Sequence, residues 1–229
     1  KEYKYLIVNY FFHIIFTSGT LFGLKQFGDK ELLFEYINLI TNYQVIFNVL
    51  IFAIPGYILI KKNDYIDTGN LNNTLIISVT FPVFLILLIL NFLGFLNIGY
   101  LHIALFTGMS ILHLHNVNLQ VGERYLTSLV YFLVGGLSFY ILPIYLYTQT
   151  GSLNLIYPFF IILTLNLLHF SRNYKFTINK NVLKDFFLFS VPATLISFVY
   201  SYFINLDRLL ILKTDNVDMM DNHFPYMLL

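Results

Sequence analysis

Long uncharged, apolar stretches alternate with short charged ones along the chain. The uncharged windows cover residues 5–24, 36–60, 68–122, 125–171 and 186–206. A helix needs about 20 mainly apolar residues to cross the hydrocarbon core of a bilayer, so the two long windows each have room for two spans. The pattern predicts seven transmembrane helices, near residues 5–24, 36–60, 73–95, 99–118, 126–147, 153–171 and 187–212.

Turn-forming stretches divide the two long windows. LNIGY at residues 96–100 separates the third and fourth predicted helices, and YTQTGSLN at residues 147–154 separates the fifth and sixth. Strands of a membrane barrel would alternate apolar and polar residues. The stretch LILLILNFLGFL at residues 85–96 has no such alternation, which favours helices.

Composition supports a membrane protein over a water-soluble one. The chain has 229 residues, of which 58% are hydrophobic and 11% charged, and its mean hydropathy is +0.72. Soluble domains carry about 25% charged residues. We therefore assign the chain to the polytopic all-α membrane proteins. Its net charge of +1 does not suggest a nucleic-acid partner, and the absence of cysteine excludes disulfides and thiolate metal sites.

Basic residues in the predicted loops indicate how the chain is oriented. Nine lie on the side of the N-terminus: Lys1, Lys4, Lys61, Lys62, Arg124, Arg172, Lys175, Lys180 and Lys184. Four lie on the other side: Lys25, Lys30, Arg208 and Lys213. Because basic loops stay in the cytoplasm, this bias predicts a cytoplasmic N-terminus.

Polar residues within the predicted spans are candidates for a cavity lining. Asparagines at positions 42, 48, 91, 166 and 205, with Gln44, predict a polar bundle interior. His13, His102 and His169 also lie in spans, where ionisable groups raise a functional hypothesis. His113 and His115 are two positions apart and point in divergent directions on a helix, so they cannot easily share one metal ion. The pattern favours imidazoles that face the bundle interior over a metal site.

Sequence signatures of membrane-embedded enzymes are missing. The chain has no GxSxG, no P-loop and no paired carboxylates within a span. Gly135–Gly136 lies in the middle of a span, where small residues favour close helix packing. Prolines at 55, 82, 143 and 192 lie in spans, as is common in transporters with bent helices.

One segment resembles a known family. A basic loop leads into FSVPATLISFVYSYFINLDRLLI at residues 189–211. This stretch is similar to the seventh helix of bacterial polysaccharide flippases, which belong to the multidrug/oligosaccharidyl-lipid/polysaccharide exporter superfamily. In that helix an early proline precedes a closing Asp-Arg, here Pro192, Asp207 and Arg208. The turn around Glu123 and Arg124 and the stretch FGDKELLFEYINLI at residues 27–40 also resemble the family in spacing and orientation.

The resemblance implies a function and a set of partners. It implies a flippase that moves undecaprenyl-pyrophosphate-linked oligosaccharides across the bacterial inner membrane by alternating access, for O-antigen or capsule export. A glycan polymerase or other export machinery would act with it. No cofactor is expected, although coupling to H⁺ or Na⁺ is open. The candidate residues are Asp207, Arg208, Asn205 and Pro192 for the gate, Glu123 and Arg124 for the cytoplasmic turn, and His13, Asn42, His102 and His169 for the cavity.

Members of the family have two six-helix bundles, so this chain corresponds to only part of a family member. Residues 1–171 match a first six-helix lobe, residues 172–185 a basic cytoplasmic linker, and residues 186–229 the start of a second lobe. A fragment and a truncated reading frame both account for this length. Other transporters of the superfamily, such as drug or cation antiporters, and a polytopic glycan polymerase or acyltransferase remain alternatives. An interfacial anchor, with Arg208 reaching the headgroups, is the alternative to a gate.

Overall fold

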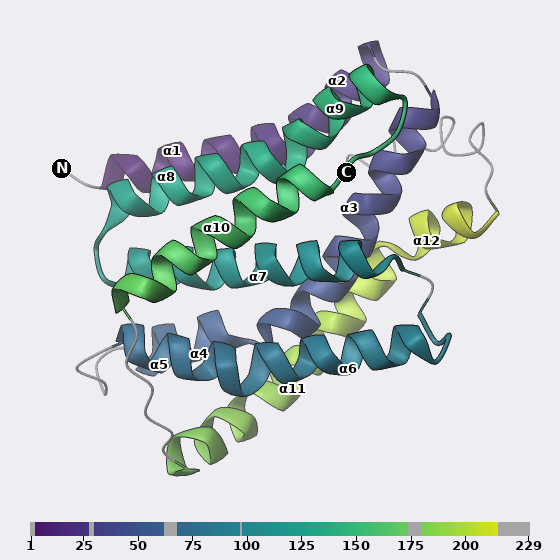
Figure 1. Ribbon diagram of the computed structural model, residues 1–229. Coiled ribbons are helices and arrows are strands. Elements are labelled where there is room, and N and C mark those ends of the chain that lie inside the picture. The colour runs from purple at the N-terminus through teal and green to yellow at the C-terminus, as the bar shows by residue number, and fades with distance from the viewer. Residues whose placement is uncertain (1–2, 28–29, 62–67, 97, 174–179, 215–229) are drawn as a thin grey trace.

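Helices make up all the regular structure in the part of the chain described by a computed structural model, residues 3–27, 30–61, 68–96, 98–173 and 180–214. They form seven consecutive segments, one at each of the predicted positions (Figure 1). Here α marks an α-helix and η a π-helical turn. The first four segments are α1 (Tyr3–Ile14), η1 (Ile15–Gly19) and α2 (Thr20–Phe27); α3 (Lys30–Ile51) and α4 (Ile54–Lys61); α5 (Thr68–Leu75), η2 (Ile76–Thr80) and α6 (Phe81–Phe92); and α7 (Tyr100–Val121). The last three are α8 (Tyr125–Gly136), η3 (Leu137–Ile141) and α9 (Leu142–Thr150); α10 (Ile156–Asn173); and α11 (Lys180–Ile204) with α12 (Leu206–Lys213).

Four helical stretches are long and apolar enough to cross a membrane. They are Ile7–Gln26, Gly69–Phe92, Tyr125–Thr150 and Lys180–Ile204. The pair α3 and α4, bent by 42°, makes a fifth if both helices belong to one span. Among the described residues the structure thus has four or five spans by length and composition, against the seven predicted. α10 contributes a shorter apolar helix, Ile156–Phe170. α7 is not among the helices that are apolar enough to cross a membrane by this measure.

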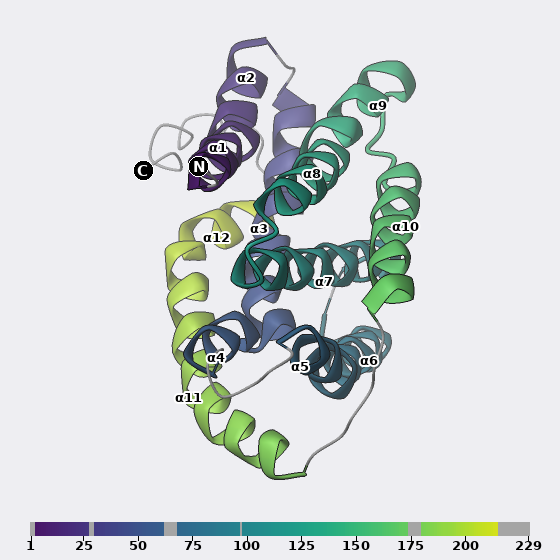
Figure 2. The ribbon, with the colours of Figure 1, turned by 90° about the vertical axis from the view of Figure 1, so that its left-hand side faces the viewer.

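The position of α7 explains its lower hydropathy. It lies at the centre of the bundle, in contact with α3, α8 and α10, as Figure 2 shows end-on. Its buried residues include the polar Ser110, His115 and Asn116. A helix enclosed by other helices can carry polar groups that lipid would exclude, because neighbouring helices receive them. A criterion based on hydropathy alone therefore leaves out such an enclosed helix.

Large apolar side chains cover the outside of the bundle. Phe92 is 78% exposed, Tyr10 72% and Ile196 71%. Exposed apolar surface of this extent is not found on soluble monomers and marks a surface that another apolar phase covers. Together with the apolar helices, it supports a membrane protein.

Gly135 and Gly136 let α8 pack closely against its neighbours, as the sequence predicted. A Cβ on Gly135 would collide with Leu112 of α7, and one on Gly136 would lie 2.5 Å from the Phe16 ring of η1. Small residues allow this close approach between helices. The pair therefore fixes the distance from α8 to the first and fourth segments.

The second segment is broken between α3 and α4. Phe52 and Ala53 have positive φ angles of 46° and 56°, which cost energy for residues other than glycine. Pro55 follows within α4 and cannot donate a backbone hydrogen bond. The Phe52 ring packs against Phe186 and Phe187 of α11, with centroids 6.2 and 6.0 Å away. The single helix predicted at residues 36–60 is thus two helices.

The seventh segment differs from the predicted helix 187–212 at both ends. α11 begins at Lys180, so the end of the predicted linker 172–185 forms its first turns. The chain leaves α11 at Asn205, whose side-chain amide donates to the Ser201 carbonyl at 2.8 Å. Such a local bond competes with the helical pattern. Asp207 and Arg208 therefore lie on the first turn of α12.

The helix ends alternate between two ends of the bundle. Figure 1 shows the start of α1, the end of α4, the start of α5, the α7–α8 turn, the end of α10 and the start of α11 at one end. It shows the end of α2, the start of α3, the end of α6, the start of α7, the end of α9, the start of α10 and α12 at the other. Basic residues divide accordingly. At the first end lie Lys4, Lys61, Arg124, Lys180 and Lys184, with Arg172 in the last turn of α10; at the second lie Lys25, Lys30, Arg208 and Lys213. Lys1, Lys62 and Lys175 lie outside the described residues.

Candidate functional site

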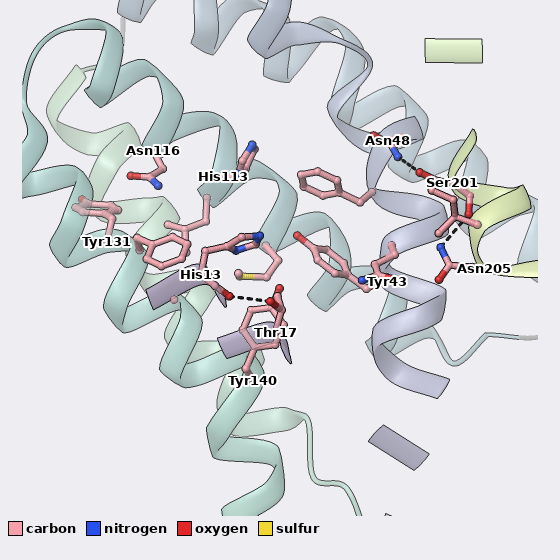
Figure 3. Close-up of a pocket in the computed structure, with 17 residues that line it drawn as sticks. His13, Thr17, Tyr43, Asn48, His113, Asn116, Tyr131, Tyr140, Ser201 and Asn205 are labelled. Atoms are coloured by element: carbon pink, nitrogen blue, oxygen red, sulfur yellow. Dashed lines mark hydrogen bonds between the residues drawn. The ribbon is translucent and has the colours of Figure 1, made fainter. Parts of the chain in front are cut away.

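A cavity of about 400 Å³ lies inside the bundle, between the first, second, fourth, fifth and seventh segments (Figure 3). Its polar lining residues are His13, Thr17, Tyr43, Gln44, Asn48, His113, Asn116, Tyr131, Tyr140, Ser201 and Asn205. Its apolar lining residues are Phe47, Met109, Leu112, Phe132, Gly135 and Ile204. The volume is within the range of small-molecule sites.

Helical periodicity explains how these residues share one space. α7 contributes Met109, Leu112, His113 and Asn116, which are spaced three, four and seven positions after the first and lie on one face. α3 contributes positions 43, 44, 47 and 48, again one face. His13 and Thr17 are four apart on the first segment. Each helix therefore turns a single polar and aromatic stripe toward the cavity.

Aromatic rings form much of the wall. The Phe47 ring meets the His113 ring edge-on, with centroids 5.1 Å apart, and Tyr43 packs against Phe47 at 5.3 Å. On the facing side, the Phe132 ring lies 6.0 Å from the His13 ring. These contacts hold both imidazoles in place. The aromatic rings also line the cavity, where they offer a surface on which the apolar face of a ligand can pack.

Hydrogen bonds tie the lining of α3 to α11. The Asn48 side-chain amide donates to the Ser201 hydroxyl at 2.5 Å, as Figure 3 shows. On the other side of the cavity, the Ser128 hydroxyl of α8 donates to the side-chain amide oxygen of Asn116 at 2.5 Å. The cavity is thus bordered by amides and hydroxyls that hold one helix to the next.

Arg208 lies next to the cavity and contacts two of its lining residues. Its guanidinium donates to the Asn205 side-chain oxygen at 3.3 Å and, over a longer distance of 3.5 Å, to that of Gln44. Both acceptors line the cavity. Arg208 therefore joins the seventh segment to α3. Among the described residues, those that line the cavity include no Asp, Glu, Lys or Arg.

The cytoplasm-facing end predicted from the sequence carries a second contact between the second and seventh segments. The Asp185 carboxylate of α11 accepts a hydrogen bond from the Tyr57 hydroxyl at 3.0 Å and pairs with Lys61 of α4 at 3.2 Å. Counting the bonds of Asn48 and Arg208, polar contacts join these two segments at three levels. The seventh segment is thus attached to the second along most of its length.

The structure brings some of the predicted site residues together and leaves others apart. His13 and Asn205 line the cavity, while Asp207 is exposed on α12 and Pro192 is exposed on α11. Glu123, with a φ of 59°, and Arg124 form an exposed turn between α7 and α8, at the end opposite α12.

Three predicted cavity residues are not in the lining. Asn42 is half-buried on another face of α3, and its amide donates to the Asn38 carbonyl at 2.9 Å. His102 meets Phe106 edge-on at 6.1 Å. His169 of α10 stacks on His115 at 3.9 Å, behind the cavity wall. Helix rotation turns each of the three away from this cavity.

The HLH stretch behaves as its spacing predicted. His113 faces the cavity and His115 faces α10, so the two imidazoles point to different surfaces. Within the described residues, no group of three or more His, Cys, Asp or Glu side chains is arranged to hold a metal ion.

The sequence indicated the polar lining residues Gln44, Asn48 and Asn205, but it did not indicate the aromatic lining residues. Tyr43, Tyr131 and Tyr140 line the cavity although nothing distinguishes them locally from the other aromatic residues, which make up 19% of the chain. The only sequence signal is the shared spacing with Gln44, Asn48 and His113 on their helices.

Comparisons of the chain with protein-family models, with curated proteins and with solved structures found no match.

Proposed function

We propose that the chain forms part of a bacterial inner-membrane flippase that moves lipid-linked oligosaccharides across the bilayer by alternating access. The observation that carries this proposal is the uncharged cavity, rich in amides and aromatic rings, inside a bundle whose outer surface is apolar. Such a bundle offers a polar route to a substrate whose lipid part remains in the bilayer. The resemblance of residues 189–211 to a flippase helix points the same way.

The lining chemistry suits a glycan. Sugar rings present hydroxyls, which amides and hydroxyls can bind, and apolar ring faces, which pack on aromatic side chains. Asn48, Asn116 and Ser201 supply the first kind of group, and Tyr131 and Phe132 the second. Because polar groups are costly in hydrocarbon, a cavity of this kind lowers the barrier for moving a glycan across the membrane.

The contacts between the second and seventh segments suit a gate. In the proposed transporter, residues 1–171 form the first six-helix lobe and residues from 186 onward begin the second, giving seven transmembrane helices in this chain. Asn48–Ser201 and Gln44–Arg208 then join side chains of the two lobes, and Lys61–Asp185 joins the first lobe to the end of the linker. Contacts of this kind can break and re-form as the lobes move relative to each other.

The basic end of the bundle faces the cytoplasm in this proposal. That end carries the larger basic set, in keeping with the retention of basic loops on the cytoplasmic side. The N-terminus is then cytoplasmic and α12 is periplasmic. A glycan polymerase or other export proteins would receive the substrate on the periplasmic side.

The described lining favours a glycan over an inorganic cation. Among the lining residues that the structure describes, none is acidic and able to neutralise such an ion. Amides and hydroxyls can bind sugars without a carboxylate, so we propose the flippase over the cation antiporter.

Flipping of a fluorescent lipid-linked oligosaccharide in proteoliposomes tests the proposal. We expect the intact protein to accelerate flipping, and Asn48→Ala to reduce the rate by about tenfold, a loss of about 1.4 kcal/mol of stabilisation. Asn42→Ala is the matched control, because Asn42 is the same residue on the same helix but outside the cavity. Export of a soluble cation without flipping of the lipid would instead identify an antiporter and refute the proposal.

A further inference from the structure

Two imidazoles from different segments face the same cavity. His13 comes from α1 and His113 from α7, and Figure 3 shows both near the middle of the lining. Histidine is the side chain that gains a positive charge near physiological pH. A cavity without a fixed charge in its lining therefore contains two groups that can become cationic.

Among the residues that the structure describes in the cavity lining, none is acidic. The other titratable groups there are Tyr43 from α3, Tyr131 from α8 and Tyr140 from η3. α11 contributes Ser201 and Ile204, and η1 contributes Thr17. Arg208 of α12 reaches the lining through Gln44 and Asn205. On the far side of α7, His169 of α10 stacks on His115 and not on His113.

These surroundings set the charge balance of the cavity. With both imidazoles neutral, an anion entering the lining would meet no positive charge except Arg208 at the edge. An anion deep in a low-dielectric site is costly unless a cation accompanies it. Conversely, a bound anion favours the protonated form of a nearby imidazole. Anion binding and proton uptake by the cavity must then strengthen each other.

We propose that His13 and His113 form a proton-dependent anion site, which binds the pyrophosphate diester of a lipid-linked substrate when an imidazole is protonated. This assignment of the ligand rests on the proposed flippase function. The aromatic and amide parts of the lining bind the sugars in this arrangement, and the imidazoles bind the phosphates. Binding of the substrate thus brings a proton into the cavity, and loss of that proton weakens the anion's hold.

Binding of UDP-glucose to the intact protein in phosphatidylcholine nanodiscs tests the anion site. UDP-glucose is a soluble pyrophosphate diester whose charge does not change over the range tested. We expect it to bind about tenfold more tightly near pH 5.5 than near pH 8. His13→Gln with His113→Gln should abolish this difference. His113→Arg should give tight binding at both pH values, because its charge is permanent.

Histidines outside the cavity provide matched controls. His102→Gln and His169→Gln should keep the pH dependence of the wild type, since neither residue lines the cavity. Retention of the full pH dependence by the double variant, or equal wild-type affinity at both pH values, would overturn the anion site. Because this assay needs no transport, its outcome is independent of whether the protein flips lipids.

A flipping assay identifies the source of the anion. For a lipid-linked substrate, flipping should slow when His13 and His113 are both replaced, most of all near pH 5.5. Unchanged flipping by a double variant that no longer binds UDP-glucose would mean that the site takes a soluble anion, and would overturn the assignment to the lipid-linked substrate. Absence of flipping by the wild type at any pH would refute the proposed function instead.

Discussion

Gly135 and Gly136 show how single residues set the shape of the cavity wall. Gly135 lines the cavity, and both glycines leave room for a neighbouring side chain where a Cβ would collide with it. The position of α8 against α7 and η1 therefore depends on the absence of two methyl groups. Since α8 also carries Tyr131 and Phe132, this spacing fixes where the aromatic wall lies.

Replacing Gly136 with alanine should destabilise the protein by about 1–3 kcal/mol, because the new Cβ would lie within contact distance of the Phe16 ring and force it to move. Gly23→Ala is the matched control. Nothing lies within 4 Å of a Cβ at Gly23, so alanine there should be neutral or stabilise α2 by up to about 1 kcal/mol. Thermal unfolding in detergent measures both changes. Equal stability of the two variants would show that the α8 contact tolerates a methyl group.

At the scale of elements, breaks in the helices decide which segments meet. The α3–α4 break at Phe52 and Ala53 lets α4 follow α11, so that Lys61 and Tyr57 reach Asp185. The break at Asn205 places Arg208 next to Gln44 of α3. Straight helices at either position would carry these side chains elsewhere. The contacts between the second and seventh segments are thus a consequence of two departures from regular helix.

Covalent linkage of α3 to α11 should arrest the proposed transport. The chain has no cysteine, so Asn48→Cys with Ser201→Cys creates one reactive pair that a short, cleavable bifunctional thiol reagent can join. We expect flipping to fall by about tenfold or more on linkage and to recover on cleavage, because the two lobes must separate there.

A pair between α7 and α8 is the control for this experiment. The Gln120 amide donates to the Ser128 hydroxyl at 3.2 Å, outside the cavity lining. Linking Gln120→Cys to Ser128→Cys should leave flipping largely unchanged, since both helices belong to the first lobe of the proposed transporter. Full transport with α3 and α11 linked would show that this contact is not part of a gate.

At the scale of the whole molecule, the helices bring basic residues to both ends of the bundle. One end carries Lys4, Lys61, Arg124, Lys180 and Lys184 with the exposed turn at Glu123, and the other carries Lys25, Lys30, Arg208 and Lys213 with the turn at Gly151 and Ser152. Hydrophobic thickness alone does not orient such a bundle, but the distribution of basic residues does.

Thiol labelling in intact cells should reveal this orientation. A membrane-impermeant maleimide should not modify Glu123→Cys, because that turn faces the cytoplasm in the proposed topology, but should modify Ser152→Cys. Both side chains are exposed in the structure, so permeabilised cells should give equal labelling and serve as the control. The reverse pattern would invert the topology, and with it the side on which Arg208 and α12 lie.

Helix positions were accessible to prediction because the bilayer makes a charge in its core costly. The uncharged windows therefore marked each helical segment, and the turns at residues 96–100 and 147–154 fell between described helices. Hydropathy did not predict how enclosed a helix would be. α7 has the polar residues of a central helix, which only its contacts with α3, α8 and α10 explain.

The sequence by itself indicated that apolar lipid surrounds this protein, and it determined the approximate positions of the helical segments and the division of the basic residues between two ends. These follow from local composition, since each depends on how residues near one another interact with lipid and water. Only the tertiary structure decided which polar stripes face each other. His13 and His113, or Gln44 and Arg208, meet because helices far apart in the chain pack with particular rotations and breaks. Those rotations depend on side-chain contacts such as Gly136 with Phe16 and Phe52 with Phe186, which no local pattern encodes.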